Sequence, residues 1–312
     1  MNISEHFKSL NYYLGIKIFK NDNLFTYSLY TYLLNFFLKK RINNKKEHEL
    51  FKNGFLKINK VDKKFIININ NEIHKQITDQ SGLPILKYEI NNNLKSYLKN
   101  FLINISKEPI NILKNLFKCN VYITTVQIRR TYHINKNEFK NESIYSEDFH
   151  CDKYVGTHYK QFIYLNDVDA HNGPFIYMSK DMTKKFVKNF RFKNRFIKDT
   201  SKEKLDKFEN YFTGEKGSSI LVNTTQCLHR AGIPKQGKFR DIIVITYVAS
   251  PNIKDPDPMY FSKNFEDQFW NKDLDGMFSK KLAKFKNNKE ILRNLFKHIN
   301  QIKEFNDNNY TS

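Results

Sequence analysis

The hydrophobic pattern changes period near residue 120, from helical spacing to the alternation that is typical of strands. Before that point, an apolar run over 24–40 predicts a helix that begins after Asp22 or Asn23 and ends on basic residues. Apolar residues at helical spacing predict a second helix over 87–107 and a short third one over 110–117. The stretch 42–80 is ambiguous, and 65–69 is its only strand-like piece. We therefore expect a mostly helical leader over 1–118 that packs on the outside of a sheet.

After residue 120 the sequence is rich in β-branched and aromatic residues. The pattern predicts a long strand over 121–134 and shorter ones at 147–152, 160–165, 175–178, 218–222 and 240–249. Short strands that follow a helical leader indicate a mainly β barrel or sandwich with flanking helices. We expect a single domain over 1–312, with its β core at 119–250, a basic helical insertion at 179–213, and a C-terminal helical extension at 251–312.

The net charge of +21 suggests an anionic partner, such as a nucleic acid, a membrane surface or a phosphorylated substrate. However, Lys is spread along the whole chain and accompanies abundant Asn and Ile, which favours a compositional origin for the charge. Basic residues and Phe alternate within 179–213, a pattern that can bind nucleic acid by phosphate contact and base stacking. An amphipathic helix with its Phe side chains inward explains the same pattern more simply. Nucleic acid is therefore the less favoured partner.

Cysteine spacing and the N-terminal pattern bear on the compartment. The three Cys residues have no paired spacing, so neither a disulfide framework nor a zinc site is indicated, and a reducing cytoplasm fits. The N-terminus lacks the basic and apolar regions of a secretory signal. The most apolar window, 24–38, is interrupted by polar residues and is shorter than the ~20 residues that span a bilayer. We expect a cytoplasmic protein with no membrane span.

Candidate metal ligands occur at two places in the β region. In an extended segment His150 and Asp152 share one face, while Cys151 points away. His229 follows another apolar run and offers a third ligand. Two His and one carboxylate form the facial triad of non-haem Fe(II) oxygenases, which leaves positions open for a co-substrate and dioxygen. Arg240 heads the last strand, where its guanidinium could bind a dicarboxylate through two parallel hydrogen bonds.

An H-x-D triplet is common by chance, but the order of His-x-Asp, apolar strand, distal His and Arg is far more specific. Four segments in this order resemble the phytanoyl-CoA dioxygenase family of Fe(II)/2-oxoglutarate oxygenases: 149–152, 160–168, 172–175 and 227–232, the last leading to Arg240. The resemblance implies a double-stranded β-helix, a jelly-roll or cupin-like barrel. It also implies that His150, Asp152 and His229 bind Fe(II) and that Arg240 binds 2-oxoglutarate. Related iron halogenases have a small residue at the carboxylate position, so Asp152 favours hydroxylation over chlorination.

The chain departs from the family pattern at two places. The residues 177–181 replace a Pro-Gly-Ser-His-like segment, and Ala231 stands where a short polar residue often follows the distal His. A second contact to 2-oxoglutarate must therefore come from elsewhere, and the candidates are Thr246, Tyr164 and Gln127.

Several other residues have weaker signals. His158 and His171 lie in polar stretches near turns, so we expect them on the surface or in loops. Cys227 is expected to be a small buried apolar residue. Alternation sends one of Arg129 and Arg130 inward, where it would bind an anionic part of the substrate or pair with a buried carboxylate.

Together these features predict an Fe(II)- and 2-oxoglutarate-dependent dioxygenase that uses O2, hydroxylates a C–H bond of a small-molecule substrate, and releases succinate and CO2. The basic charge favours an anionic or carrier-bound substrate. Two alternatives stay open: a nucleic-acid-binding or demethylating protein of the same fold, and a non-catalytic β-barrel. The sequence leaves the substrate and the oligomeric state open.

Overall fold

The computed structural model describes residues 44–77, 85–117, 121–133, 149–152, 158–189, 192–193, 196–197 and 206–249. The helices are α3 (Lys45–Asn53), α4 (Lys63–His74), α5 (Asn92–Phe117) and α6 (Lys180–Asn189), with a 3-10 turn η1 (Asp206–Phe208). The strands are β1 (Phe55–Ile58), β2 (Ile85–Lys87), β3 (Val121–Tyr132), β4 (His158–Tyr164), β5 (Phe175–Tyr177), β6 (Phe192–Lys193), β7 (Phe196–Ile197), β8 (Asn210–Phe212), β9 (Ser219–Val222), β10 (His229–Ala231) and β11 (Phe239–Ala249). The helices predicted over 24–40 and within 251–312 lie outside the described residues.

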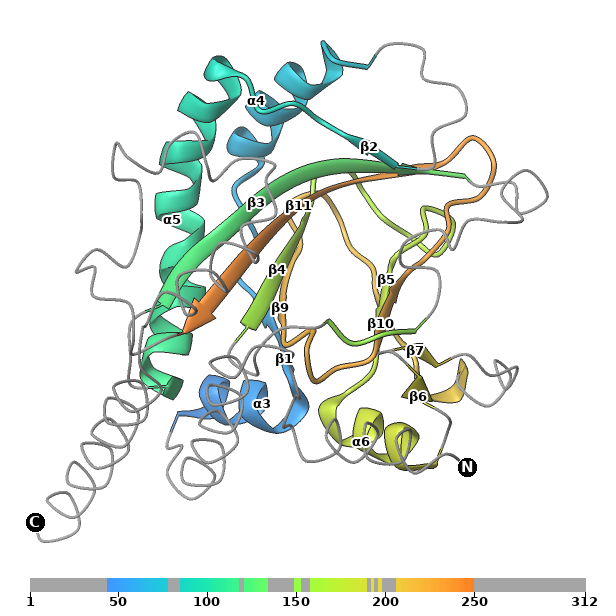
Figure 1. Ribbon diagram of the computed structural model, residues 1–312. Coiled ribbons are helices and arrows are strands. Elements are labelled where there is room, and N and C mark those ends of the chain that lie inside the picture. The colour runs from blue at the N-terminus through green and yellow to red at the C-terminus, as the bar shows by residue number, and fades with distance from the viewer. Residues whose placement is uncertain are drawn as a thin grey trace, which may run out of the picture.

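Two antiparallel sheets face each other (Figure 1). The large sheet has the order β1-β9-β4-β11-β3-β2, and the small sheet has the order β10-β5-β8. Strand β11 is central, because it pairs with β3 on one side and with β4 on the other. The strands predicted over 121–134, 160–165, 175–178, 218–222 and 240–249 are all present, to within two residues at either end. Within the strand predicted at 147–152, the described residues 149–152 show only an isolated bridge at His150. The described strands form a sandwich and do not close into one continuous barrel.

Aromatic side chains fill the space between the sheets. The rings of Phe162 and Phe175 stack with centroids 4.2 Å apart, and those of Tyr164 and Phe212 stack at 4.6 Å. We call the side of the large sheet that carries Phe162 and Tyr164 its inner face. The outer face packs against α3, α4 and α5, and α5 runs along it (Figure 1).

The outer layer corrects two sequence predictions. The stretch 65–69 is not a strand but part of α4, whose first turn is capped by the Asp62 side chain accepting from the Lys64 N–H. Ile66, Ile69 and Ile73 are buried along one side of this helix, and a short apolar run cannot be assigned by its period alone.

The second correction concerns α5. The helices predicted over 87–107 and 110–117 are one helix of 26 residues that passes through Pro109. Its buried face continues on both sides of the proline, at Leu102 and Leu113. Tertiary burial therefore outweighs the local cost of proline in a helix.

The remaining segments change the expected boundaries. The leader is not only helical, because it also supplies the edge strands β1 and β2 of the large sheet. The segment 179–213, predicted as a basic helical insertion, is helical over α6 and η1 but also contains the short strands β6, β7 and β8. Within α6, Phe186 is buried, as the amphipathic interpretation requires. None of the described helices combines the length and the apolar character needed to cross a bilayer.

Candidate metal centre

The three predicted ligands converge. His150, Asp152 and His229 are all buried, and each offers a ligand atom within 4.8 Å of the others. His150 and His229 form an antiparallel bridge, in which each N–H donates to the other residue's carbonyl at 3.0 Å. The Asp152 N–H donates to the Thr224 carbonyl at 2.8 Å, which holds this end of the segment 149–152 against the loop before β10.

The His229 imidazole is oriented for a metal. Its Nδ1 lies 3.0 Å from the Cys227 carbonyl, and because a carbonyl only accepts, Nδ1 carries the proton and donates. The Nε2 lone pair is therefore the one available to a cation, as in many metal-binding histidines. Burial lowers the pKa of His229 to about 3, and the neighbouring His150 adds to this effect, so the imidazole is neutral near pH 7.

The carboxylate of Asp152 completes the set. Its Oδ1 atom lies 4.0 Å from His150 Nε2 and 3.9 Å from His229 Nε2. Its Oδ2 atom lies 2.9 Å from the Nζ of Lys160. Burial opposes ionisation, but Lys160 and the surrounding imidazoles outweigh it and hold the pKa of Asp152 well below its usual range. The site therefore presents one anionic oxygen and two imidazole nitrogens.

Arg240 is buried on the inner face of the large sheet, opposite Thr131 of β3. Its guanidinium donates to the Gly173 carbonyl and to the Thr131 hydroxyl, the latter at 3.3 Å. Its Nε atom has no hydrogen-bond partner among the described residues, and no described carboxylate pairs with it. Burial lowers the pKa of Arg240 to about 10, although it stays charged near pH 7. A buried guanidinium with a spare donor fits the carboxylate of a bound dicarboxylate.

The other candidate contacts for 2-oxoglutarate also face inward. Thr246 lies opposite Thr125 and Lys160, and Gln127 lies opposite the inward Val244. Directly paired residues share a face of the sheet.

Tyr164 has a structural task as well. Its hydroxyl donates to the Phe212 carbonyl and accepts from the Phe175 N–H, so it joins the large sheet to the small one. Contacts of Thr246, Gln127 and Tyr164 with a co-substrate stay predictions.

The two arginines of β3 point in opposite directions, as predicted. Arg130 packs on the outer face and binds Asp241 through Nε at 2.7 Å and through NH2 at 2.6 Å. Arg129 is offset by one residue and shares the inner face with Arg240, whose pKa it helps to lower. The buried carboxylate is thus paired with the outward arginine.

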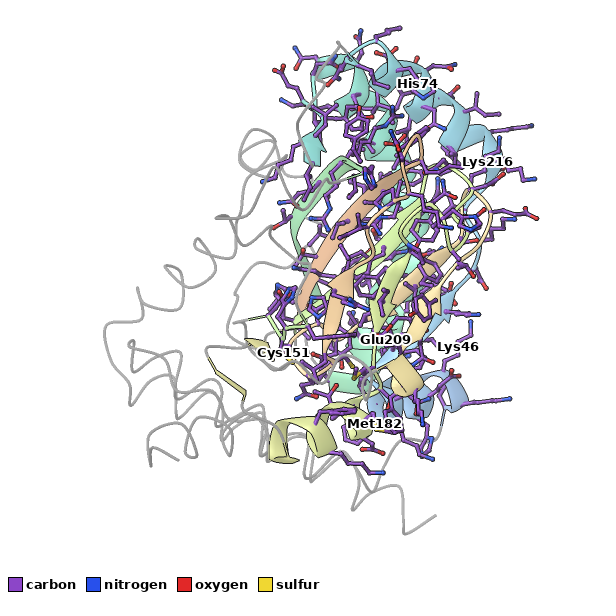
Figure 2. All side chains as sticks on the ribbon, turned by 90° about the vertical axis from the view of Figure 1, so that its right-hand side faces the viewer. Lys46, His74, Cys151, Met182, Glu209 and Lys216 are labelled. Atoms are coloured by element: carbon purple, nitrogen blue, oxygen red, sulfur yellow. The ribbon has the colours of Figure 1, made fainter. Side chains whose placement is uncertain are left out.

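Two further histidines and two cysteines that the sequence pattern singled out lie outside the candidate ligand set. His171 is exposed in a turn as expected, but His158 is buried at the start of β4, so its predicted surface position is wrong. Cys151 packs with Phe149 and Leu228, away from the ligands. In Figure 2 it lies at the end of the molecule that carries Met182 of α6, opposite the end that carries His74. Cys227 is buried among apolar residues, as predicted.

Sequence reasoning missed two residues that hold the site. Lys160 contacts Asp152 and Thr131 contacts Arg240, yet the sequence pattern indicated only a family-like strand segment for Lys160 and a strand for Thr131. The alternation along β4 carries a usable signal, because 158 and 160 share a face with Phe162 and Tyr164. A His and a Lys on the inner face of a buried strand indicate a polar site there.

The donor set fits the implied metal. Two neutral imidazoles and one carboxylate are the ligands of facial-triad Fe(II) sites, and a fourth protein ligand is not needed. Among the described residues this is the only cluster of three such groups.

Comparisons with known proteins give a likeness in structure only. No protein-family model matches the sequence, and no curated protein matches it. Among solved structures, the α-ketoglutarate-dependent epimerase SnoN from nogalamycin biosynthesis has 9% identity and a TM-score of 0.43, over 66% of this chain and 81% of that one. HygX from Streptomyces hygroscopicus, solved with nickel and 2-oxoglutarate, has 11% identity and a TM-score of 0.46, over 67% and 88%. EctD from S. alaskensis, with 2-oxoglutarate and 5-hydroxyectoine, has 13% identity and a TM-score of 0.45, over 68% and 77%. These TM-scores lie below 0.5, so the function is inferred from the side chains of the site.

Proposed function

We propose that this protein is an Fe(II)- and 2-oxoglutarate-dependent dioxygenase of the phytanoyl-CoA dioxygenase type, with a double-stranded β-helix as its core. The observation that carries the proposal is the convergence of His150, Asp152 and His229 within 4.8 Å, from segments far apart in the chain. Two facing antiparallel sheets and a buried Arg240 on the inner face support it.

Each residue has a distinct task in this proposal. His150, His229 and the Oδ1 atom of Asp152 hold Fe(II), while Arg240 binds the distal carboxylate of 2-oxoglutarate. When bound, Fe(II) with 2-oxoglutarate and dioxygen supplies an oxidant for a C–H bond, with release of succinate and CO2. The protein orients these groups and keeps water away, and the apolar lining between the sheets serves the second purpose.

The substrate class follows from charge. The inner face of the large sheet carries Arg129, in addition to Arg240, which binds 2-oxoglutarate in this proposal, and Lys160, which pairs with Asp152. We propose a small organic substrate, anionic or carrier-linked, that is hydroxylated. Aspartate at position 152 leaves no ligand position for a halide, which supports hydroxylation over chlorination.

The decisive experiment is anaerobic addition of Fe(II) and 2-oxoglutarate to the purified protein. We expect the visible charge-transfer band of the metal-chelated keto acid in the wild type and its loss in Asp152→Ala. The matched control is His171→Ala, because His171 is exposed in a turn. Absence of the band in a folded wild-type protein would remove the proposed function.

A further inference from the structure

Strand β4 carries Lys160 to the metal centre. The strand is hydrogen-bonded on both sides, with Lys160 opposite Thr246 of β11 and Val222 of β9. Its backbone is therefore held within the middle of the large sheet. Lys160 lies two residues before Phe162, so its side chain leaves the sheet on the inner face.

The two oxygens of Asp152 have different neighbours. Oδ1 is nearly equidistant from the Nε2 atoms of His150 and His229, at 4.0 and 3.9 Å. Oδ2 is 2.9 Å from the Nζ of Lys160, within the range of a charge-assisted contact. The carboxylate thus has one oxygen that faces the imidazoles and one that faces an ammonium.

We propose that Lys160 is a positioning residue that holds Oδ2 and makes Asp152 a one-oxygen metal ligand; this inference rests on the proposed function. A cation at 2.9 Å competes with a metal for the second oxygen, and like charge keeps the metal on the side of Oδ1. Outer partners of ligating carboxylates commonly set the geometry of the ligand in this way.

The number of Asp152 oxygens that bind the metal decides how many of its coordination positions stay open. An octahedral ion held by one oxygen of Asp152 and two imidazoles would keep three positions open. A chelating 2-oxoglutarate would take two of them and leave one for dioxygen. A two-oxygen carboxylate would fill that last position.

Lys160 also stabilises the site before metal binds. The side chain of Asp152 is only 4% exposed, so its charge needs a cation nearby. The side chain of Lys160 is 21% exposed, so it keeps contact with water while its ammonium reaches the carboxylate. The ion pair therefore holds Asp152 in place without the metal.

The test is carboxylate infrared spectroscopy on Zn(II)-loaded minus metal-free protein, with Asp152 bands assigned by their loss in Asp152→Ala. We expect the widely separated stretches of a one-oxygen ligand in the wild type. In Lys160→Met we expect the two stretches to draw together, because the metal takes the freed oxygen. Lys160→Arg keeps the charge and should resemble the wild type. Lys107→Met is the matched control, since Lys107 is exposed on α5 beyond the outer face.

A second measurement follows the consumption of 2-oxoglutarate in the presence of oxygen. With Fe(II), the anaerobic 2-oxoglutarate band should persist in Lys160→Met, whereas oxygen-dependent consumption of 2-oxoglutarate should fall about 10–100-fold. Lys160→Arg should restore it.

Unchanged infrared bands in Lys160→Met would overturn the inference. Two-oxygen binding in the wild type would overturn it without any variant. Zn(II) binding does not depend on 2-oxoglutarate, so loss of the proposed function would show separately, as a wild type that lacks the charge-transfer band.

Discussion

His150 and His229 are direct partners in an antiparallel bridge, with a 3.0 Å hydrogen bond in each direction. The Cα atoms of such a hydrogen-bonded pair lie about 5.5 Å apart, so the backbone alone sets the two imidazoles side by side. Their ring centroids are 4.3 Å apart. The candidate metal centre therefore lies at the point where the segment at 149–152 meets β10.

Removal of one of the paired imidazoles should abolish metal binding. In His229→Ala the site keeps only two ligands, and we expect affinity for Co(II) to fall by more than about 100-fold, since loss of an outer partner alone costs 10–100-fold. Titration calorimetry measures it, with the exposed His171→Ala as control. Wild-type affinity in His229→Ala would exclude this residue from the ligand set.

Arg240 should control the affinity for 2-oxoglutarate and not that for the metal. A hydrogen bond to a charged group contributes about 1.5–3 kcal/mol, so Arg240→Met should weaken 2-oxoglutarate binding by about 10–100-fold. Titration of the charge-transfer band measures the affinity for 2-oxoglutarate, and titration with Co(II) measures the affinity for the metal. Lys238→Met, in the exposed turn before β11, is the control. An equal loss of metal binding would mean that Arg240 supports the fold of the site instead.

The pair of Arg130 and Asp241 should stabilise the outer face of the large sheet. Both side chains are buried, at 7% and 2% exposure, and the Tyr88 hydroxyl also donates to Asp241. Arg130→Met leaves the carboxylate without its guanidinium and should lower the free energy of unfolding by about 3–5 kcal/mol. The double variant Arg130→Met/Asp241→Leu should recover part of this loss. Denaturant unfolding measures both, and a double variant less stable than Arg130→Met would contradict the explanation.

Lys180 should make stability rise in mildly alkaline solution. Burial lowers its pKa to about 8, with the charge of Lys184 adding to the effect, while Cys227 and Asp181 oppose it. In the unfolded chain a lysine keeps its proton until about pH 10.4. The unfolded state therefore binds more protons between these values, and the free energy of unfolding increases as pH rises from about 8 to 9.5. Lys180→Met should remove this increase, as measured by denaturant unfolding across the range. If the free energy of unfolding changes equally with pH in the wild type and in Lys180→Met, Lys180 is not the cause of the increase.

Local pattern was sufficient for the main elements of the β core and for the choice of the candidate ligands. The β-branched alternation of β3 and β11 appears in the chain itself, because the two-residue period of a strand assigns each side chain to a face. For the same reason His150 and Asp152 were recognisable as neighbours on one side of an extended segment.

Packing and pairing between distant segments decided the helical layer and the contacts around the candidate ligands. The run 65–69 became helical because its isoleucines meet α5 and the sheet, and α5 continued through Pro109 because its buried face does. The order of the residues cannot say which side chain lies across from which, since register depends on strands that meet only in the folded protein. The sequence thus determined the types of the candidate ligands and their spacing. Only the tertiary structure decided three further features: the contact of Lys160 with Asp152, the burial of His158, and the hydrogen bond between Arg240 and Thr131.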